Sequence, residues 1–210
     1  MENSDLLNFA RKYPGLVREY EAGQGVFSDR SKMDFDLLII EGCILEMVCS
    51  DDEDKCPTTL LYKPGDFIGH FGRGSAGVSA TSGRCLAKTL AIRIPDSEFL
   101  SLLAEDEKLS DLFSASIAQM FNRMATKFCN MVNLSPSQRV ARFIYKSYER
   151  ESGESLKITT LQLAQAVSTT RQTVSHVLGD LRKLGIISTS YGRISVLDKE
   201  RLLNFYQSED

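Results

Sequence analysis

The spacing of apolar residues along the chain changes near residue 95. From about Leu16 to Ile94, short apolar runs alternate with turn signals such as Glu41-Gly42 and Lys63-Pro64-Gly65-Asp66. Runs of this length, bounded by Gly, Pro and Asp, predict strands. About seven or eight strands at this spacing favour a small barrel or sandwich. Ahead of them, the first ten residues predict a short helix that ends before Pro14-Gly15.

A long helix is predicted next, over Lys108–Leu134, where apolar residues recur at steps of three and four. At about 1.5 Å per residue it would be about 40 Å long. It carries more large apolar side chains than one face against a small β domain can bury. Because symmetric dimers are the commonest oligomers, we expect the same helix of a second subunit to cover the remainder. Burial between two domains of one chain is the alternative. The predicted dimer contacts are Phe113, Ile117, Met120, Met124, Phe128 and Met131.

The residues after this helix predict a helix-turn-helix. Ser135-Pro136 breaks the long helix, and a new helix continues to about Glu151. Thr159 or Thr160 can then cap the short helix LQLAQAV. The inward positions of that helix are predicted to be Leu161, Ala164 and Val167. A small residue at position 164 lets the next helix cross close to it.

The second helix of the motif follows a turn at Ser168-Thr169 and is capped by Thr170. It spans the sequence RQTVSHVLGDLRKL, and Gly185 ends it as a C-cap. Its predicted inward positions are Val174, Val177, Leu178 and Leu181. Ile186–Ser188 and Ile194–Leu197 then predict a two-stranded wing.

This arrangement leaves polar side chains on the outer face of the second helix, where a recognition helix meets base edges in a major groove. These side chains are Arg171, Gln172, Ser175 and His176. Arg can bond guanine through two hydrogen bonds, and Gln can do the same with adenine. Side chains at the helix caps and the wing can contact phosphates. The predicted phosphate contacts are Thr160, Thr169, Thr170 and Arg193. A structural helical hairpin with a solvated face is the alternative interpretation.

The charges of the chain are unevenly distributed. Residues 1–135 carry 14 Lys and Arg against 20 Asp and Glu, a formal charge of −6. Residues 136–210 carry 11 against 8, a formal charge of +3. A basic C-terminal part on an acidic N-terminal part indicates that the C-terminal part meets a polyanion, although charge alone leaves ordinary fluctuation open. Together with the helix-turn-helix, it predicts double-stranded DNA as the partner.

The segment QLAQAVSTTRQTVSHVLGDLRKLGII resembles the winged helix of the Crp–Fnr superfamily of transcription regulators. The β-rich front, the motif Pro64-Gly65-Asp66-Phe67-Ile68-Gly69 and the long helix match the same family in order, from about Tyr13 to Leu197. The resemblance implies an α+β protein. Residues 1–107 would form a jelly-roll-like double-stranded β-helix that senses an effector, residues 108–134 a dimerisation helix, and residues 135–210 the winged-helix DNA-binding domain. It also implies a homodimer on a near-palindromic operator and contact with RNA polymerase.

The chain departs from the pattern of the family at three places in the helix-turn-helix. Gln172 stands where the family most often has Glu, and Ser175-His176 stands where it has Arg or Ser. The operator half-site is therefore expected to differ from the standard one of the family. Ser168 occupies a turn position where many members have Gly, which costs some energy if the φ angle is positive.

The sequence predicts that cyclic AMP is not the effector. In the family that this chain resembles, cyclic-nucleotide binders carry a Glu after Phe-Ile-Gly and an Arg-Ser pair before the next strand. This chain has His70 at the first position and the neutral residues Gly77–Thr81 at the second. Burying a phosphate without a cation costs several kcal/mol. The run Gly72–Gly77 also fits G-x-G-x-x-G, but a strand rather than a helix is predicted after it, so it is not a dinucleotide fingerprint.

A small organic effector between the β domain and the long helix is the preferred hypothesis, and its identity is unknown. The pocket is predicted to be lined by Phe67, Ile68, Gly69, His70, Phe71 and Met124. A redox sensor that uses Cys43, Cys49 or another Cys, or a haem sensor that uses His70, is an alternative. So is a DNA-binding dimer that needs no ligand.

Several classes of protein are disfavoured. The chain has no apolar run long enough to cross a bilayer and no basic start followed by an apolar block, so we expect a cytoplasmic protein without a membrane partner. Its five Cys have no framework spacing, which favours free thiols in a reducing compartment. With only two His and no paired acid–base constellation, neither a metal site nor an enzyme active site is expected.

Overall fold

The computed structural model describes residues 3–28, 31–48, 58–69, 81–150, 153 and 155–207. The chain divides into two compact units, residues 1–49 with 59–125 and residues 50–58 with 126–210. The division falls inside the helix that was predicted as a separate segment at 108–134. Each end of that helix therefore belongs to a different unit.

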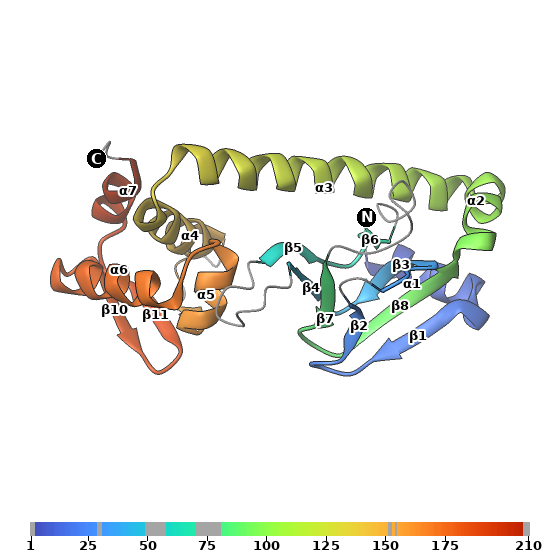
Figure 1. Ribbon diagram of the computed structural model, residues 1–210, viewed down its shortest axis with the longest axis horizontal. Coiled ribbons are helices and arrows are strands. Elements are labelled where there is room, and N and C mark those ends of the chain that lie inside the picture. The colour runs from blue at the N-terminus through green and yellow to red at the C-terminus, as the bar shows by residue number, and fades with distance from the viewer. Residues whose placement is uncertain are drawn as a thin grey trace. The chain divides into compact units, whose positions relative to one another are not determined.

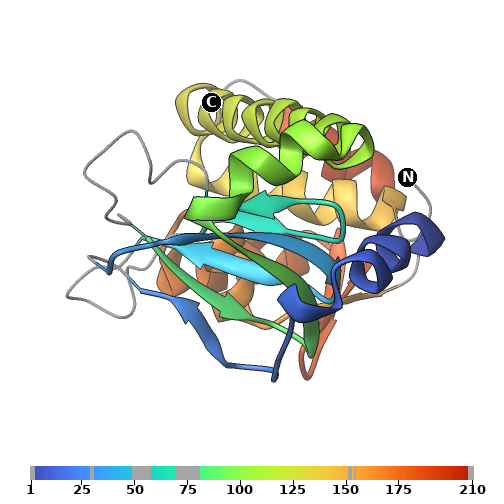
Figure 2. The same cartoon turned by 90° about the vertical axis from the view of Figure 1, so that its right-hand side faces the viewer.

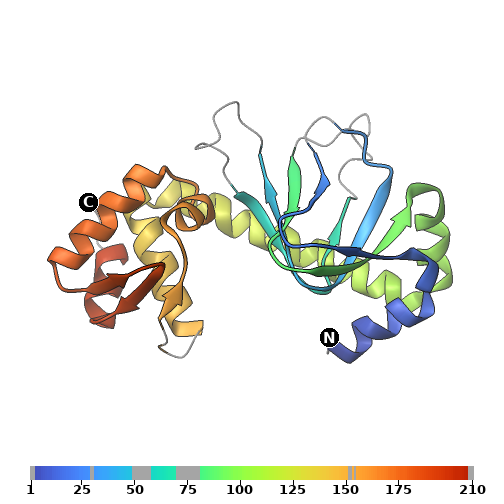
Figure 3. The same ribbon diagram turned by 90° about the horizontal axis from the view of Figure 1, so that it is seen from below.

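The first unit is a β-roll with helices at both ends of its sequence. Two sheets of four strands have the orders β1-β8-β3-β6 and β2-β7-β4-β5, and the strand pairs β1–β8, β3–β8, β3–β6, β2–β7 and β4–β7 are antiparallel. Figure 2 shows the strands of this unit in a second view. Figure 3 shows the strands of both sheets from below. In chain order the elements are α1 Asn3–Lys12, the 3-10 turn Pro14–Leu16, β1 Val17–Tyr20, β2 Gly25–Phe27, β3 Phe35–Glu41, β4 Ile44–Met47, β5 Thr58–Tyr62, β6 Phe67–Ile68, β7 Ser82–Cys85, β8 Thr89–Pro95 and α2 Asp96–Glu105.

Strand β3 lies at the centre of the first unit and is buried on both faces. Successive side chains of a strand point to opposite faces. Leu37 and Ile39 accordingly join the cluster that also contains Tyr62 and Met120. The alternate residues Leu38 and Ile40 join a second cluster with α1 and α2. The continuous apolar sequence of this strand follows from having a core on either side.

Helix α3, Glu107–Asn133, confirms the predicted long helix to within one residue at each end. Asp106 precedes it, and its Oδ1 accepts a hydrogen bond from the backbone amide of Leu109 at 3.2 Å. The other carboxylate oxygen of Asp106 accepts from Lys12 Nζ at 2.7 Å and from the Tyr13 hydroxyl at 2.8 Å. One side chain therefore caps α3 and holds the end of α1 against it. No described helix is both long and apolar enough to cross a membrane.

The second unit is a winged helix-turn-helix (Figure 1). Its strands form one antiparallel sheet of order β10-β11-β9, and α7 packs on α4. Strand β9 and helix α7 were not predicted from the sequence. After α3, the elements are α4 Pro136–Arg150, β9 Leu156–Lys157, α5 Thr160–Ala166, α6 Arg171–Lys183, β10 Ile187–Ser190, β11 Arg193–Val196 and α7 Lys199–Gln207.

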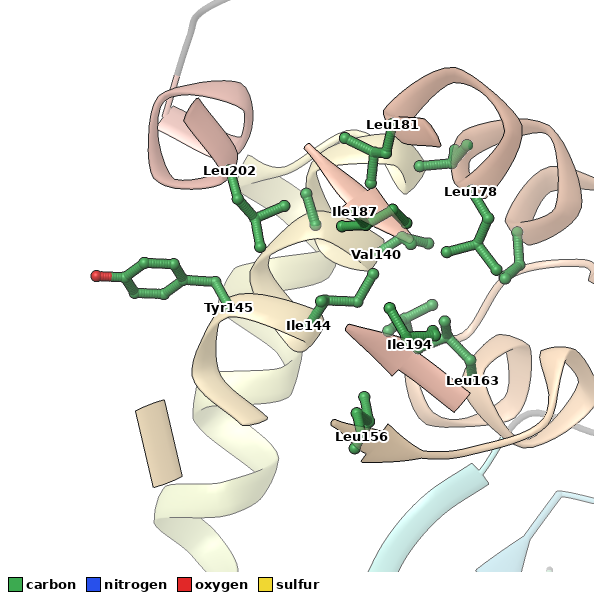
Figure 4. Packing of buried hydrophobic residues seen from close by; sticks show 14 of the residues in the cluster. Val140, Ile144, Tyr145, Leu156, Leu163, Leu178, Leu181, Ile187, Ile194 and Leu202 are labelled. Atoms are coloured by element: carbon green, nitrogen blue, oxygen red, sulfur yellow. The ribbon is translucent and has the colours of Figure 1, made fainter. Parts of the chain in front are cut away.

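One apolar core joins all the helices of the winged helix (Figure 4). Val140 and Ile144 from α4, Leu163 from α5 and Leu181 from α6 are at most 1% exposed. Leu161, predicted to face inward, is 40% exposed, so that prediction was wrong. Ala164 and Val167, the other two positions predicted to face inward, are buried, and Leu163 takes the place in the core that was predicted for Leu161.

Candidate nucleic-acid interface and effector site

The start of α6 is fixed by its N-cap and by its buried face. Thr170 Oγ1 accepts a hydrogen bond from the backbone amide of Thr173 at 3.1 Å, as an N-cap residue does. The four apolar positions that the sequence predicted to face inward are all buried. They are Val174, Val177, Leu178 and Leu181. The rotation of the helix is thereby set, and the opposite face points to solvent.

The exposed face of α6 carries the four side chains that were predicted to contact bases. Arg171, Gln172, Ser175 and His176 are all exposed, and they occupy the first two turns of the helix. His176 Nδ1 lies 3.0 Å from Asp180 Oδ2, one turn further along. This contact involves one of the two ring nitrogens of His176. The side chains of this face can donate and accept hydrogen bonds, which are the interactions that contact base edges in a major groove.

The turn between α5 and α6 is strained and is held by an arginine. Ser168 has a φ angle of +53°, so the energetic cost expected from the sequence at this position is present. Arg139 Nε donates to the carbonyl of Val167 at 3.0 Å, and Nη2 donates to the carbonyl of Ser168 at 3.2 Å. Its Nη1 donates to the carbonyl of Leu134, the residue after α3, at 2.9 Å. Arg139 was missed by sequence reasoning because a lone Arg on an amphipathic helix ordinarily points to solvent.

The predicted phosphate contacts lie at helix starts and on the wing. Thr159, rather than Thr160, is the N-cap of α5, and it forms a capping box with Gln162. Thr160 is the first residue of α5, while Thr169 and Thr170 lead into α6. Arg193 begins β11 with its side chain exposed, and its Nη1 lies 3.5 Å from Ser155 Oγ.

The residues predicted to line an effector pocket have different surroundings. Phe67 is 2% exposed, and its ring meets those of Phe99 and Phe113 edge-on, with centroids 6.3 and 5.3 Å away. Phe67 and Ile68 are therefore part of the closed core. Gly69 has a φ angle of +124°, and a Cβ there would lie 2.5 Å from the carbonyl oxygen of Phe35, so its role is conformational. His70 and Phe71 lie outside the described residues.

A cluster of polar side chains joins the β-roll to α3. The Arg123 guanidinium on α3 bonds the carboxylate of Asp66 through Nη1 at 2.8 Å, and Asp66 also accepts from the amide of Lys63 at 2.8 Å. The Nε and Nη2 atoms of Arg123 are buried and find no acceptor among the described residues. A buried donor without a partner costs free energy, so these two groups suit a ligand with acceptor atoms.

Glu46 and Tyr62 extend this cluster. The Tyr62 hydroxyl donates to Glu46 Oε2 at 3.2 Å and lies 3.8 Å from Met120 Sδ. The Thr81 hydroxyl donates to Glu46 Oε1 at 2.7 Å. Burial, followed by the charge of Glu46, raises the pKa of Tyr62 well above its ordinary value, so this hydroxyl stays a donor at neutral pH. Sequence reasoning missed the cluster, although Arg123, three residues after Met120 on the same helix, is a charged residue beside the buried stripe.

The residues predicted as dimer contacts fall into two groups. Phe113, Ile117 and Met120 pack into the core of the first unit of their own chain, and Met120 is only 2% exposed. Within this chain they contact the β-roll and α2. The remaining three are exposed, together with two apolar neighbours that were not predicted. The exposed set is Phe121, Met124, Phe128, Met131 and Val132.

The redox hypothesis finds no support among the described cysteines, and the haem hypothesis depends on His70, which lies outside the described residues. Cys43 is half-buried, Cys85 is buried and Cys129 is exposed, and all three are free thiols. Burial raises the pKa of the Cys85 thiol, which disfavours the reactive thiolate. Cys49 and Cys56 lie outside the described residues. The described side chains contain no group of three His, Cys, Asp or Glu arranged to hold a metal ion.

Comparisons with known proteins agree with this architecture. Residues 138–205 match the family of Crp-like helix-turn-helix domains. Transcriptional regulator SdrP of Thermus thermophilus is 29% identical over 180 residues, which are 81% of this chain and 83% of that protein. A CRP-like cAMP-activated global transcriptional regulator of Mycobacterium tuberculosis is 22% identical over 191 residues, or 88% of this chain and 85% of that protein.

A solved structure shows the same fold. The c-di-GMP responsive global regulator CLP of Xanthomonas campestris superposes with a TM-score of 0.79 at 15% identity, covering 90% of this chain and 98% of that one. This likeness confirms the predicted fold class of a β-roll, a long helix and a winged helix.

Proposed function

We propose that this chain is a transcription regulator of the Crp–Fnr superfamily and that it binds a near-palindromic operator as a homodimer through the exposed face of α6; the Crp-like helix-turn-helix match at residues 138–205 and the similarity to a transcriptional regulator support the proposal. The observation that carries the proposal is the division of α6 into two faces. One face is fully buried in the core of the winged helix, and the other presents only polar side chains in its first two turns. A recognition helix needs this combination of a fixed rotation and an accessible polar face.

We assign to each polar residue of this face a contact with the DNA. Arg171 bonds guanine and Gln172 bonds adenine, in both cases through two hydrogen bonds. Ser175 and His176 contact neighbouring bases. Phosphates are contacted by Thr160, Thr169, Thr170 and Arg193, which are near the N-terminus of a helix or on the wing.

The dimer is proposed to form along α3. Phe121, Met124 and Phe128 recur at steps of three and four and are between 51% and 69% exposed in the single chain. Large apolar side chains gathered on one face indicate an interaction site. We assign this exposed face, rather than Phe113, Ile117 and Met120, to the contact between subunits, because those three already pack within their own chain.

The effector is proposed to be an organic molecule other than cyclic AMP that offers acceptor atoms to Arg123. The unsatisfied Nε and Nη2 of Arg123 support acceptor atoms on the ligand. The sequence argument against cyclic AMP remains the presence of His70 and of neutral residues at 77–81. The Mycobacterium tuberculosis relative is activated by cAMP, so this chain would differ from it in its ligand.

Regulation would proceed by a shift between two arrangements of α3. Arg123 lies in the part of α3 that belongs to the first unit, and residues 126–133 of the same helix belong to the unit that carries α6. A ligand that prefers one packing of Arg123 would shift the population of the dimer toward the arrangement in which both α6 helices reach the DNA. The protein would act in the cytoplasm as a regulator and not as an enzyme, with RNA polymerase as a further partner.

Selection of duplexes from a random pool tests the proposed function. The full chain is expected to enrich an inverted repeat whose half-sites lie about 10 base pairs apart, centre to centre. The matched variant Arg171→Ala should enrich a motif that has lost preference at one symmetric pair of positions. An absence of enrichment by the wild-type chain at low salt would overturn the proposal.

Calorimetric titration with cyclic AMP should give no heat of binding, and micromolar binding would overturn the effector assignment.

A further inference from the structure

A small cavity that is partly open to solvent lies in the second unit, lined by the end of α3 and by helices α4 and α5. Its volume is about 170 Å³. An engineered apolar cavity of about 150 Å³ holds a benzene molecule, so this one has room for a single ring. Most of its wall is apolar. The apolar lining consists of Met131, Leu134, Phe143, Ala166 and Val167.

Four cations border the same cavity, and none of the described residues lining it is acidic. They are Lys127, Arg139, Arg142 and Lys146. Burial lowers the pKa of Lys127, which means that its charged form is poorly solvated there. Like charges that converge on a partly desolvated site repel one another. An anion in the cavity would relieve both costs.

The existing bonds of the cations show which of them can accept a ligand. Arg139 already donates to the carbonyls of Leu134, Val167 and Ser168. Arg142 donates through Nη1 to the side-chain oxygen of Asn130, and Lys146 lies 5.7 Å from the ring centre of Tyr145. Lys199 and, to a smaller extent, the charge of Lys146 lower the pKa of Glu149, so Lys146 acts on this carboxylate as well as bordering the cavity. Arg142 and Lys146 can donate hydrogen bonds to a ligand, while Arg139 contributes its charge and holds the wall in place.

We propose that this cavity is a second ligand site, which binds a single-ring carboxylate of about the size of benzoate. The ring would fill the apolar space beside Leu134, Phe143 and Val167, and the carboxylate would accept hydrogen bonds from Arg142 and Lys146. Inorganic phosphate has no apolar body to fill this space, and a neutral ring brings no negative charge to the cations that border it. The combination of shape and charge selects an amphipathic monoanion.

The position of the site gives it a route to the DNA-binding motif. Its wall includes Arg139, which joins the end of α3 at Leu134 to the strained turn at Ser168. A ligand that tightens this wall would tighten the turn that precedes α6. Binding in the cavity itself does not depend on the proposed DNA recognition, and it is distinct from the cluster around Arg123 in the first unit.

Calorimetry with benzoate and with benzyl alcohol tests the site on the full chain. Benzoate should bind with one site per chain, and the neutral alcohol of the same size should bind at least tenfold more weakly. Amide resonances that shift on adding benzoate should include those of Leu134 and Val167. Equal binding of the two probes, no binding of benzoate at millimolar concentration, or shifts confined to the first unit would each overturn the proposal.

Two kinds of substitution test separately how the charges and the apolar space of the cavity contribute to benzoate binding. Lys146→Gln, at an exposed position on α4, should weaken the affinity for benzoate at least fivefold, whereas Lys108→Gln at the opposite end of α3 should leave this affinity unchanged.

Ala166→Leu should fill the cavity and abolish benzoate binding, while Ala166→Ser should retain it. Both Ala166 variants are checked for cooperative thermal unfolding. Arg171→Ala should bind benzoate as the wild-type chain does, so failure of DNA recognition and failure of this site are distinguishable. Full affinity in Lys146→Gln, or in a folded Ala166→Leu, would contradict the assignment.

Discussion

At the scale of single residues, some side chains are held in place by hydrogen bonds and others are left exposed to solvent. Arg139 and Ser168 illustrate the first kind, since the guanidinium of Arg139 bonds two carbonyls of a turn with a positive φ angle and a third carbonyl just after α3. Arg171 illustrates the second kind, because it begins α6 and its side chain is exposed. Held residues are expected to affect folding when they are changed, and exposed residues are expected to affect binding.

Arg171→Ala should weaken operator binding by about 1–3 kcal/mol and relax specificity at one base pair of each half-site. The reason is the loss of two hydrogen bonds to guanine, with the fold unchanged because the side chain is exposed. Gel-shift measurements on operators substituted one position at a time provide the readout. The control is Arg201→Ala, an exposed Arg on α7 that removes the same charge. An unchanged base preference in Arg171→Ala would refute the assigned role.

At the scale of elements, Asp106 joins two helices through one carboxylate. Although burial alone would raise the pKa of this group, hydrogen bonds from Lys12, Tyr13 and the Leu109 amide hold it below its ordinary value of 3.8. A carboxyl group whose pKa is lower in the folded state stabilises the fold above its unfolded pKa. That contribution is lost as the pH falls through the folded value.

Asp106→Asn should therefore lower the free energy of unfolding by about 1 kcal/mol at pH 7, since it keeps an acceptor for the Leu109 amide but removes the charge facing Lys12. The difference from the wild-type chain should shrink as the pH falls below about 4 and through the lowered pKa of Asp106 in the folded state. Urea unfolding at a series of pH values measures it. Asp111→Asn, at an exposed site of α3, is the matched control and should show little effect. A difference that stays constant with pH would contradict the role of the charge.

The elements themselves differed in how far the sequence could predict them. The long helix and the two helices of the DNA-binding motif have clear periodicity and caps, and the structure confirms them. Helix α7 has only nine residues and is stabilised by packing on α4, as in the contact between the Tyr145 and Tyr206 rings, so its local sequence is a weak signal. Strand β9 has two residues and exists only because it pairs with β11 across more than thirty residues of sequence.

The candidate sites were predictable in the same uneven way. The outer face of α6 follows from local spacing, and every predicted base-contact residue is exposed on that face. The cluster of Glu46, Tyr62 and Arg123 is assembled from two strands and a helix, and sequence spacing contains no information on such long-range contacts. Leu161 shows that even a local prediction can miss one position of a short helix, since Leu163 is buried in its place while Ala164 and Val167 are buried as predicted.

At the scale of the whole molecule, the exposed apolar face of α3 requires a partner in the proposed dimer. Met124→Asp should dissociate that dimer, because a carboxylate buried in an apolar interface without a partner is strongly unfavourable. Met124 is 51% exposed in the single chain, so the substitution should leave the fold intact. Sedimentation velocity measures the outcome. Leu100→Asp, at a 71% exposed apolar site on α2, is the control and should remain dimeric. A dimer that survives Met124→Asp would contradict the assigned face.

The spacing of the operator half-sites gives the most direct test of the central claim, that two α6 helices bind DNA as a twofold pair. Half-sites one helical turn apart, about 34 Å, lie on the same side of the duplex. Inserting five base pairs between the selected half-sites turns one of them to the opposite side. Affinity measured by fluorescence anisotropy is predicted to fall at least a hundredfold after this insertion. Equal affinity for the two duplexes would contradict the account.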